Sequence, residues 1–167
     1  IYLKGVSLMT EYNDPSLRPA VDIDILFERD ELFEANDLLK KNNYSGLFKD
    51  LSNKDLIRYL GNKNHLPHLK RETNVTIELH NRLTNPVDFE ICPITSQVFD
   101  NKKLINFYNT KIFTPSIDDI IVHQLVHFSI NSDFFNQLRT FSDIYQIEKN
   151  YKIDWIKIFS KNKNIKI

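Results

Sequence analysis

Two aspartates, Asp22 and Asp24, lie two positions apart in the segment 21–27, where they alternate with apolar residues. Alternation with a period of two predicts a β-strand that has one apolar face and one acidic face. Carboxylates side by side on one face repel each other unless a positive charge lies between them. A hard divalent cation such as Mg²⁺ suits oxygen ligands of this kind. The alternative is an acidic strand face that is simply exposed to solvent.

A second segment, 75–80, has the same alternation and supplies a third carboxylate. Its apolar residues would point to one face of a strand, and Glu78 and His80 to the other. If the two strands are neighbours in one sheet, Glu78 joins Asp22 and Asp24 around a shared cation pocket. Such a cluster could hold two metal ions for an in-line phosphoryl displacement. We therefore predict a catalytic and metal-binding role for the three carboxylates. His80 would contact this site, support one of its ligands, or simply lie at the surface.

Several motifs follow one another along the chain: Lys4-Gly5, Tyr12, Arg18, Asp22-x-Asp24 and Glu78-Leu79-His80. In this order and spacing they resemble a family of nucleotidyltransferases in the DNA polymerase beta superfamily. The pattern of that superfamily is a glycine at a helix start, a D-x-D strand and a third acidic residue on a later strand. The stretch 115–127, with Leu138-Arg139 and Asp143, resembles the helical half of the family. The resemblance covers most of residues 1–150.

The resemblance implies an α/β (α+β) fold, with a small mixed sheet flanked by helices over residues 1–110. A helical region, 111–167, would pack against this core, with the nucleotide in the cleft between them. The implied activity moves a nucleoside monophosphate from an NTP to a hydroxyl of a small-molecule or protein acceptor and releases pyrophosphate. It implies Mg²⁺ or Mn²⁺, as two ions, held by Asp22, Asp24 and Glu78, and Glu78 would accept the proton of the acceptor.

The same resemblance assigns the nucleotide to the beginning of the chain. Lys4, Gly5 and Ser7 would lie under the phosphates, and Arg18 would neutralise their charge. From chemistry alone, Arg18 could equally pair with an aspartate and hold the site together. The residue after Gly5 is Val6, where the superfamily usually has serine or glycine. This difference favours the alternative function, a catalytically inactive nucleotide-binding or partner-binding module on the same fold.

The elements that position these residues follow from hydrophobic periodicity and capping signals. The sequence predicts strands at 1–3, 21–27, 65–69 and 74–80, and helices at 4–12, 31–42, from Ser52, at 94–99, 116–130 and 133–149. Ser52 with Asp55, and Ser116 with Asp119, form capping boxes. The last helix would present an apolar face of Phe134, Leu138, Phe141 and Tyr145, and the basic tail 161–167 would fray.

Two pairs of residues at helical spacing have structural explanations as well as functional ones. His123 and His127 lie four residues apart, which is a metal-ligand spacing, but apolar neighbours favour a packed, hydrogen-bonded pair over a ligand or substrate contact. Arg139 and Asp143, also four apart, predict an ion pair on a helix surface.

Composition excludes several classes of protein. Three glycines, at 5, 46 and 61, are too far apart for a Walker A loop, a dinucleotide-binding motif or a kinase glycine loop. With 22 basic and 22 acidic residues the formal net charge is zero, so a nucleic-acid partner is not expected. No apolar run approaches the ~18 residues of a membrane span, and no membrane partner is expected.

The remaining signals concern the cellular setting. The one cysteine, Cys92, cannot form an internal disulfide, and we expect it to be a small buried hydrophobic residue. We expect a cytoplasmic protein on these grounds. The chain starts at Ile1 and its one methionine is Met9, so we expect it to begin within a longer protein.

Overall fold

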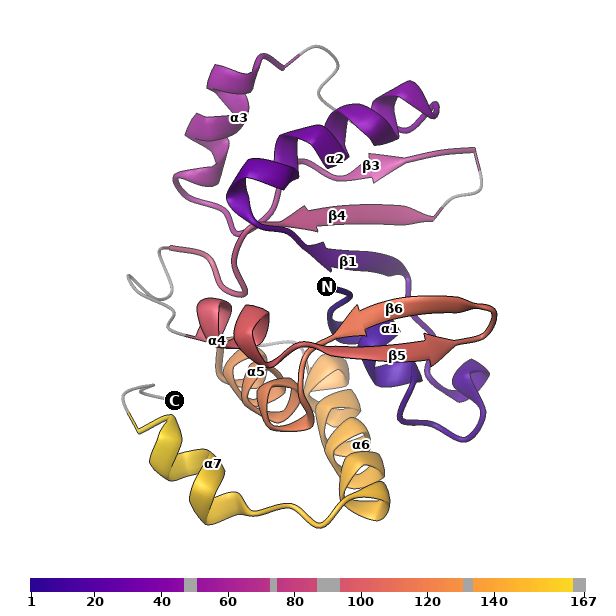
Figure 1. Cartoon of the computed structure of the whole chain (residues 1–167), viewed down its shortest axis with the longest axis vertical. Coiled ribbons are helices and arrows are strands. Elements are labelled where there is room, and N and C mark those ends of the chain that lie inside the picture. Colours follow the sequence, from indigo (N-terminus) through magenta and orange to yellow (C-terminus); the bar gives the residue numbers. More distant parts are fainter. Residues whose placement is uncertain (47–50, 73–74, 87–93, 131–133, 164–167) are drawn as a thin grey trace.

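The computed structural model describes residues 1–46, 51–72, 75–86, 94–130 and 134–163, without the side chains of 134–137 (Figure 1). Two predictions concern residues outside this description: the burial of Cys92, and the fraying of the basic tail, of which 164–167 are not described. In chain order the elements are α1 (Lys4–Met9), η1 (Pro15–Leu17), β1 (Asp22–Leu26), α2 (Arg29–Lys41), β2 (Ser45–Gly46), α3 (Asn53–Leu60), β3 (Leu69–Lys70), β4 (Thr76–His80), α4 (Ile94–Asn101), β5 (Lys103–Phe107), β6 (Thr110–Thr114), α5 (Ile117–Ile130), α6 (Phe134–Asn150) and α7 (Trp155–Lys161).

The main sheet has four strands in the order β1-β4-β3-β2. β1 pairs with β4 in parallel, while β3 is antiparallel to both β4 and β2. A small mixed sheet flanked by helices was predicted, and the structure confirms it. Helices α2 and α3 lie along one side of the sheet (Figure 1). They cover its apolar face with one hydrophobic cluster, whose fully buried members are Leu32, Leu56, Leu60, Leu66, Leu69, Ile77 and Leu79.

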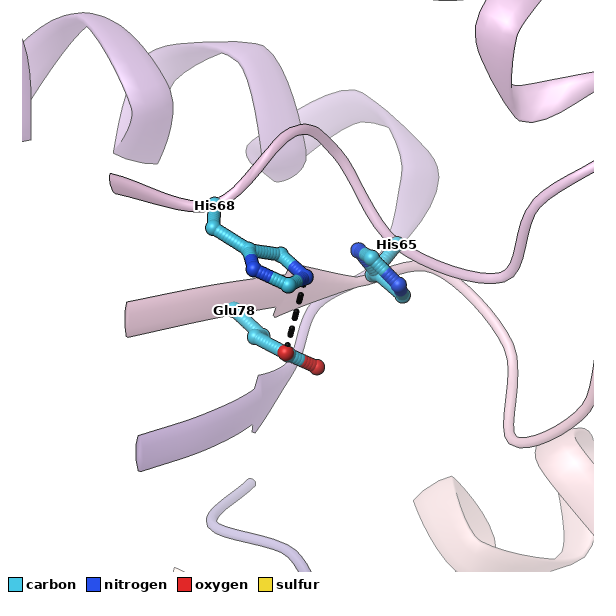
Figure 2. Close-up of side chains that lie close together, drawn as sticks. All are labelled: His65, His68 and Glu78. Atoms are coloured by element: carbon cyan, nitrogen blue, oxygen red, sulfur yellow. Dashed lines mark ion pairs between the residues drawn. The ribbon is translucent and has the colours of Figure 1, made fainter. Parts of the chain in front are cut away.

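The predicted strand 65–69 is largely an irregular connection between α3 and β3. His65 makes a single bridge to His80, and ladder pairing with β4 begins only at Leu69. Pro67 has no N–H to donate to a ladder, which explains why regular pairing does not start earlier. His65 and His68 therefore come from a loop, and their side chains turn toward β4 (Figure 2).

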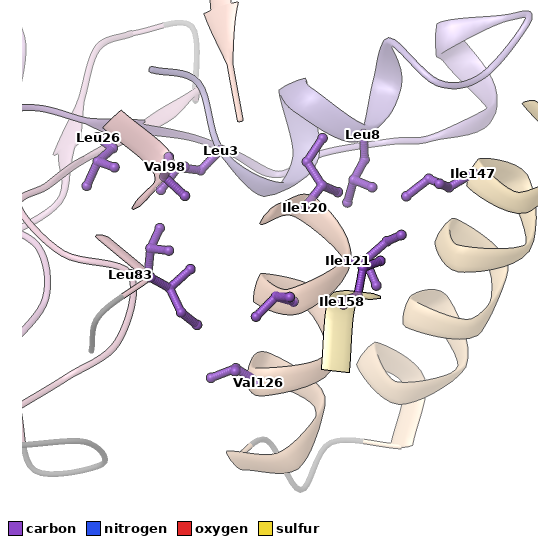
Figure 3. Close-up of a cluster of buried hydrophobic side chains, with 12 residues drawn as sticks. Leu3, Leu8, Leu26, Leu83, Val98, Ile120, Ile121, Val126, Ile147 and Ile158 are labelled. Carbon is purple, nitrogen blue, oxygen red and sulfur yellow. The ribbon is translucent and has the colours of Figure 1, made fainter. Parts of the chain in front are cut away.

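The C-terminal helices pack on the beginning of the chain through a second hydrophobic core (Figure 3). This core combines residues from α1, β1 and α4 with residues from α5, α6 and α7. Its buried members are Leu3, Leu8, Leu26, Leu83, Ile94, Val98, Ile120, Ile121, Val122, Val126, Ile147 and Ile158. Burial of each such side chain stabilises the fold by roughly 1.5–3 kcal/mol. The helical region thus shares its core with the N-terminal segment.

A two-stranded hairpin, β5–β6, was not predicted from the sequence. Apolar residues are adjacent in each strand, as Leu104-Ile105 and Ile112-Phe113, so the sequence lacks the alternation that marks a half-buried sheet. Leu104 and Phe113 are 54% and 44% exposed. The hairpin lies beside residues 1–3, which were predicted to form a strand. In the structure these residues form an isolated β-bridge between Tyr2 and Ile25 instead. The Tyr2 amide donates to the Phe113 carbonyl oxygen at 2.8 Å. β6 and β1 thus contact Tyr2 on opposite sides.

The predicted apolar face of the last long helix is wrong for the residues whose side chains are described. Leu138, Phe141 and Tyr145 are 49%, 60% and 69% exposed. Phe134 lies among the residues without described side chains. The buried side of α6 instead carries Thr140 and Asp143 beside Ile147. The helix is oriented by polar contacts to the N-terminal segment, and these override its apolar spacing.

Both predicted helix starts are confirmed by their capping contacts. At α3 the Asp55 amide donates to Ser52 Oγ, and the Ser52 amide donates to the Asp55 carboxylate. At α5 the Asp119 amide donates to Ser116 Oγ, whose hydroxyl donates to Asp119 at 2.6 Å. Among the described helices, none has the length and apolarity needed to cross a membrane.

His123, in the middle of α5, gives the fold a specific acid sensitivity. Its side chain is buried, and its Nε2 has no hydrogen-bond partner among the described residues. Burial, together with the positive charge of Lys4, lowers the pKa of His123 from 6.5 to about 3. The unfolded chain therefore binds a proton between pH 6.5 and pH 3 that the folded chain does not, and stability falls as the pH falls through this window.

We expect His123→Leu to remove this part of the acid sensitivity. Between pH 7 and pH 4.5 the wild type should lose roughly 2–3 kcal/mol more unfolding free energy than His123→Leu. Urea unfolding at both pH values measures the difference. Ile121→Val is the control, because a lost methyl group costs about 1 kcal/mol at either pH. Equal pH dependence in wild type and His123→Leu would contradict the prediction.

Candidate functional site

The acidic residues meet where β1 and β4 pair. Asp24 lies directly opposite Glu78 in the parallel register, and Asp22 lies opposite Thr76. Because partners in register share a face, both aspartates and Glu78 project from the same side of the sheet. That side is opposite the face covered by α2 and α3. Ligand atoms of Asp24, Glu78 and His80 all lie within 4.8 Å of one another.

The carboxylate of Asp24 is buried, and only one of its two oxygens has a partner among the described residues. Its Oδ1 accepts from Lys4 Nζ at 2.9 Å and lies 2.8 Å from His80 Nε2. The Asn64 amide lies 3.4 Å from His80 Nδ1, which leaves Nε2 to carry the proton that is donated to Asp24. Asp24 Oδ2 is buried without a partner among the described residues. A buried carboxylate oxygen in this state is well suited to ligate a cation.

The two partners of Asp24 keep it ionised. Burial alone would raise the pKa of Asp24, but the His80 hydrogen bond and the Lys4 charge outweigh it and lower the pKa well below 3.8. Burial likewise acts to lower the pKa of Lys4, and the adjacent Asp24 carboxylate reverses the effect, so that the pKa of Lys4 is raised. Lys4 therefore supplies one positive charge to the acidic face.

Asp22 and Glu78 differ in how their charges are compensated. Burial and then the negative charges of Asp24 and Glu78 raise the pKa of Asp22, so repulsion between carboxylates persists there. For Glu78 burial opposes ionisation, but the hydrogen bond from His80 prevails and lowers the pKa. Glu78 lies 3.3 Å from His80 Nε2 and 2.9 Å from His68 Nε2. A divalent cation near Asp22 would remove the remaining repulsion.

A cavity of about 250 Å³ opens beside the two aspartates. Its acidic wall is β1, and the opposite wall comes from α5 and α6. Its lining residues are Lys4, Gly5, Arg18, Ala20, Val21, Asp22, Asp24, Gln124, His127, Arg139, Thr140 and Asp143, whereas Glu78 and His80 of β4 are not among them. Sites for drug-sized ligands typically reach 300–1,000 Å³, so this cavity suits phosphate groups better than a whole nucleotide. A second hollow, lined by Val6, Met9, Ala20, Val21, Asp22, Ile23 and Val75, adjoins it.

The wall of the cavity formed by α5 and α6 was largely missed by the sequence analysis. A ligand or substrate contact of His127 was the less favoured alternative, Arg139 was assigned to an ion pair, and Gln124 and Thr140 were not singled out. His127 and Gln124 lie three residues apart on α5, so a helical periodicity places them on one face. No sequence signal connects that face to Asp22. His123 and His127 were also predicted to be packed and hydrogen-bonded. The two rings pack edge to face with their centres 6.5 Å apart, but Nε2 of His123 has no hydrogen-bond partner among the described residues.

Arg18 pairs with an aspartate, and that aspartate is Asp143 of α6. Arg18 Nε and Nη2 donate to the two Asp143 oxygens at 2.7 and 3.0 Å, and Nη1 donates to the Pro19 carbonyl. The Tyr12 hydroxyl also donates to Asp143, at 2.8 Å. The predicted ion pair between Arg139 and Asp143 is wrong, because Arg18 engages both oxygens. Arg139 is exposed at the rim of the cavity.

Gly5 and Ser7 hold the first helix in place in different ways. A Cβ at position 5 would lie 2.6 Å from Ala20 Cβ, so only glycine allows α1 to approach the segment before β1 this closely. Ser7 is buried, and its hydroxyl donates back to the Lys4 carbonyl at 3.1 Å. Lys4 has φ 37°, a strained value for a residue other than glycine. Gly5 and Lys4 line the cavity, whereas Ser7 is not among its lining residues.

Comparisons with known proteins place this arrangement in a family. A family described as an uncharacterised nucleotidyltransferase matches residues 1–167, and the chain belongs to that family. No curated protein matches the chain. A similar solved structure is an antigenic nucleotidyltransferase-like protein from Paracoccidioides brasiliensis, with a TM-score of 0.52 and 14% sequence identity. The match covers 87% of this chain and 65% of that one, and at this identity it supports the fold alone.

The tight approach at Gly5 predicts a compensating pair of mutations. Gly5→Ala should destabilise the protein by roughly 1–3 kcal/mol, because the added methyl group overlaps Ala20. Ala20→Gly removes the overlapping carbon, so the double mutant should regain most of the loss. Urea unfolding of both single mutants and the double mutant measures this. Additive losses in the double mutant would show that the two positions do not contact each other.

The Arg18–Asp143 pair predicts a large asymmetry between two arginines. Arg18→Met leaves the buried Asp143 carboxylate without its cation, which should cost about 3–5 kcal/mol. Arg139→Met should change the unfolding free energy by less than about 0.5 kcal/mol, since its side chain is at the surface. The double mutant Arg18→Met with Asp143→Leu should recover part of the loss. A similar loss for both arginine variants would contradict the pairing.

Proposed function

We propose that this member of the uncharacterised nucleotidyltransferase family is a metal-dependent enzyme. In the proposed reaction it transfers a nucleoside monophosphate from an NTP to a hydroxyl of a small-molecule or protein acceptor. The single observation that carries the proposal is the buried Asp24 Oδ2, which has no partner among the described residues and belongs to a carboxylate lining a cavity with Arg139 on its opposite side. Asp22, Asp24 and Glu78 would hold Mg²⁺ or Mn²⁺, as two ions, which when bound neutralise charge on the phosphates and lower the pKa of the attacking hydroxyl.

The residues of the chain have separate parts in this proposal. Lys4, His127 and Arg139 surround the space for the triphosphate with positive charge or hydrogen-bond donors. Arg18 contributes mainly by fixing α6 through Asp143, since all three of its nitrogens are already engaged. Ser7 has no phosphate contact in this arrangement and supports α1. Gly5 gives the phosphates close access to the backbone of α1.

The bonds that change define the chemistry. The acceptor oxygen attacks the α-phosphorus of the NTP, and the bond from this phosphorus to the oxygen bridging to the β-phosphorus breaks. Pyrophosphate carries away the electron pair of that bond. The His80 hydrogen bond lowers the pKa of Glu78 and keeps its carboxylate ionised. As a carboxylate it would receive the proton of the acceptor hydroxyl, whose pKa a bound metal ion would have lowered. The zero net charge of the chain favours an acceptor other than DNA or RNA.

The adjoining hollow gives Val6 a place in the proposal. It shares Ala20, Val21 and Asp22 with the phosphate cavity, and Val6 and Met9 add apolar surface. A base or an apolar part of the acceptor would lie against this surface. Where the superfamily usually has serine or glycine after the first glycine, this chain has Val6. The side chain of Val6 would offer an apolar contact in place of a hydroxyl group.

A second candidate function is a nucleotide-binding or partner-binding module without turnover. Two observations favour it. Val6 follows Gly5, and the ammonium group of Lys4 already pairs with Asp24, where a cation would otherwise bind. Calorimetry with each NTP and Mg²⁺, followed by a pyrophosphate-release assay with candidate acceptors, separates the two functions. Metal-dependent binding without release would favour the module.

Neutralising the two aspartates should have different effects on stability and the same effect on binding. Asp22→Asn removes like-charge repulsion, so the melting temperature should stay level or rise by roughly 1–3 °C. Asp24→Asn removes the carboxylate that Lys4 and His80 share, and should cost about 1.5–3 kcal/mol. Both variants should weaken Mg²⁺-dependent NTP binding at least tenfold in calorimetry.

The exposed Asp37 of α2 offers a matched control, because Asp37→Asn makes the same chemical change away from the site. It should leave NTP binding and the melting temperature unchanged. If Asp22→Asn binds NTP and Mg²⁺ as tightly as the wild type does, the proposed metal site is wrong.

A further inference from the structure

Two histidines and a glutamate converge at the outer end of the acidic face. His65 and His68 come from the loop before β3, and Glu78 comes from β4 (Figure 2). One ligand atom from each of the three lies within 4.8 Å of the other two. His68 Nε2 is 2.9 Å from Glu78 Oε1, and the ring centres of His65 and His68 are 5.0 Å apart. This group is distinct in composition from the aspartates, since it offers two nitrogens and one oxygen.

The contacts within the group are compatible with metal binding. His68 Nε2 and Glu78 Oε1 lie 2.9 Å apart, and a metal ion would take the place of the proton between them. His65 Nδ1 lies 2.7 Å from the Leu66 carbonyl oxygen, so this nitrogen donates its proton and Nε2 keeps a lone pair. A backbone contact of this type orients a histidine that ligates a metal. His68 is 46% exposed on its side chain, so solvent reaches the group from one side.

The ligand types and spacing determine which ion fits. Mg²⁺ prefers oxygen ligands and an octahedral shell with several waters, which two imidazoles do not supply. Zn²⁺ binds imidazole nitrogen and carboxylate oxygen at about 2.0–2.2 Å, in a tetrahedral arrangement whose ligand atoms lie roughly 3.3 Å apart. Rotation of the exposed His68 ring can bring atoms within 4.8 Å to that spacing. The solvent-exposed side would leave the fourth position to water.

We propose that His65, His68 and Glu78 form a binding site for Zn²⁺ or a similar transition-metal ion. Glu78 belongs both to this group and to the group formed with Asp24 and His80. An ion held by the histidines draws on the same carboxylate as an ion held by the aspartates. Zinc binding and Mg²⁺-dependent NTP binding should therefore weaken each other. This coupling rests on the proposed function, whereas the zinc site itself does not.

The experiment is a titration of the metal-free chain with Zn²⁺, by calorimetry and by competition with a chromophoric chelator. A Cys92→Ser background removes the one thiol of the chain. We expect one equivalent of Zn²⁺ to bind, at least tenfold more weakly in His65→Gln and in His68→Gln. Co²⁺ added instead should give visible absorption bands of a four-coordinate site, lost in both variants. Circular dichroism checks that each variant is folded.

Two further variants separate this site from the aspartates. His127→Gln is the matched histidine control and should bind Zn²⁺ as the parent does, because His127 lies on α5 beside the other cavity wall. Asp22→Asn should also keep Zn²⁺ binding. Zinc affinity that is unchanged in both His65→Gln and His68→Gln would overturn the proposal. The contacts would then be an ion pair between His68 and Glu78 beside the tilted ring of His65.

The coupling is read from NTP titrations with Mg²⁺ in the presence and absence of one equivalent of Zn²⁺. We expect the dissociation constant of the NTP to rise several-fold with Zn²⁺ in the parent, and not in His68→Gln. If the chain binds Zn²⁺ but no NTP under any condition, the proposed function fails and the zinc site stands. If the chain binds NTP but no Zn²⁺, the zinc site is wrong and the proposed function stands.

Discussion

The parallel pairing of β1 with β4 is the constraint on which the rest of the site depends. It sets Asp24 beside Glu78, and a slip of one residue would turn Glu78 to the face covered by α2 and α3. Burial of two neighbouring carboxylates requires compensating positive charge and hydrogen bonds. Lys4 from α1 and His80 from β4 supply them to Asp24. The sheet and the first helix are therefore held together by the same carboxylate that gives the site its chemistry.

A second buried carboxylate, Asp143, joins the helical region to the N-terminal segment. Its bidentate contact with Arg18 and its hydrogen bond from Tyr12 connect residues more than 120 positions apart in the chain. These contacts orient α6 so that Thr140 and Asp143 face the cavity, while Leu138 and Phe141 are left exposed. The cavity exists because α5 and α6 are fixed opposite β1. The wall from α5 and α6 faces the two aspartates with Gln124, His127, Arg139 and Thr140.

The polar face of the sheet combines two kinds of ligand around Glu78. Toward β1 the neighbours are carboxylates and an ammonium group, which suit a hard cation and phosphate. Toward the loop before β3 the neighbours are imidazoles, which suit a softer metal ion. Glu78 contacts both sides, through His80 at 3.3 Å and His68 at 2.9 Å. A chain with one carboxylate shared in this way can make occupancy of one side depend on the other.

The sequence alone was sufficient for the local features. Period-two alternation located β1 and β4 and put Asp22 with Asp24, and Glu78 with His80, on one face of their own strands, while the pairing that brings the two faces together came from the structure. The capping residues Ser52 and Ser116 located two helix starts. These signals are local because strand pleating and capping depend on residues a few positions apart. Only the tertiary structure decided that Arg18 binds Asp143, that His127 and Arg139 line the cavity, and that His65 and His68 reach Glu78. Those contacts depend on how distant elements pack, and the exposed strands β5 and β6 carried too little hydrophobic pattern to be recognised.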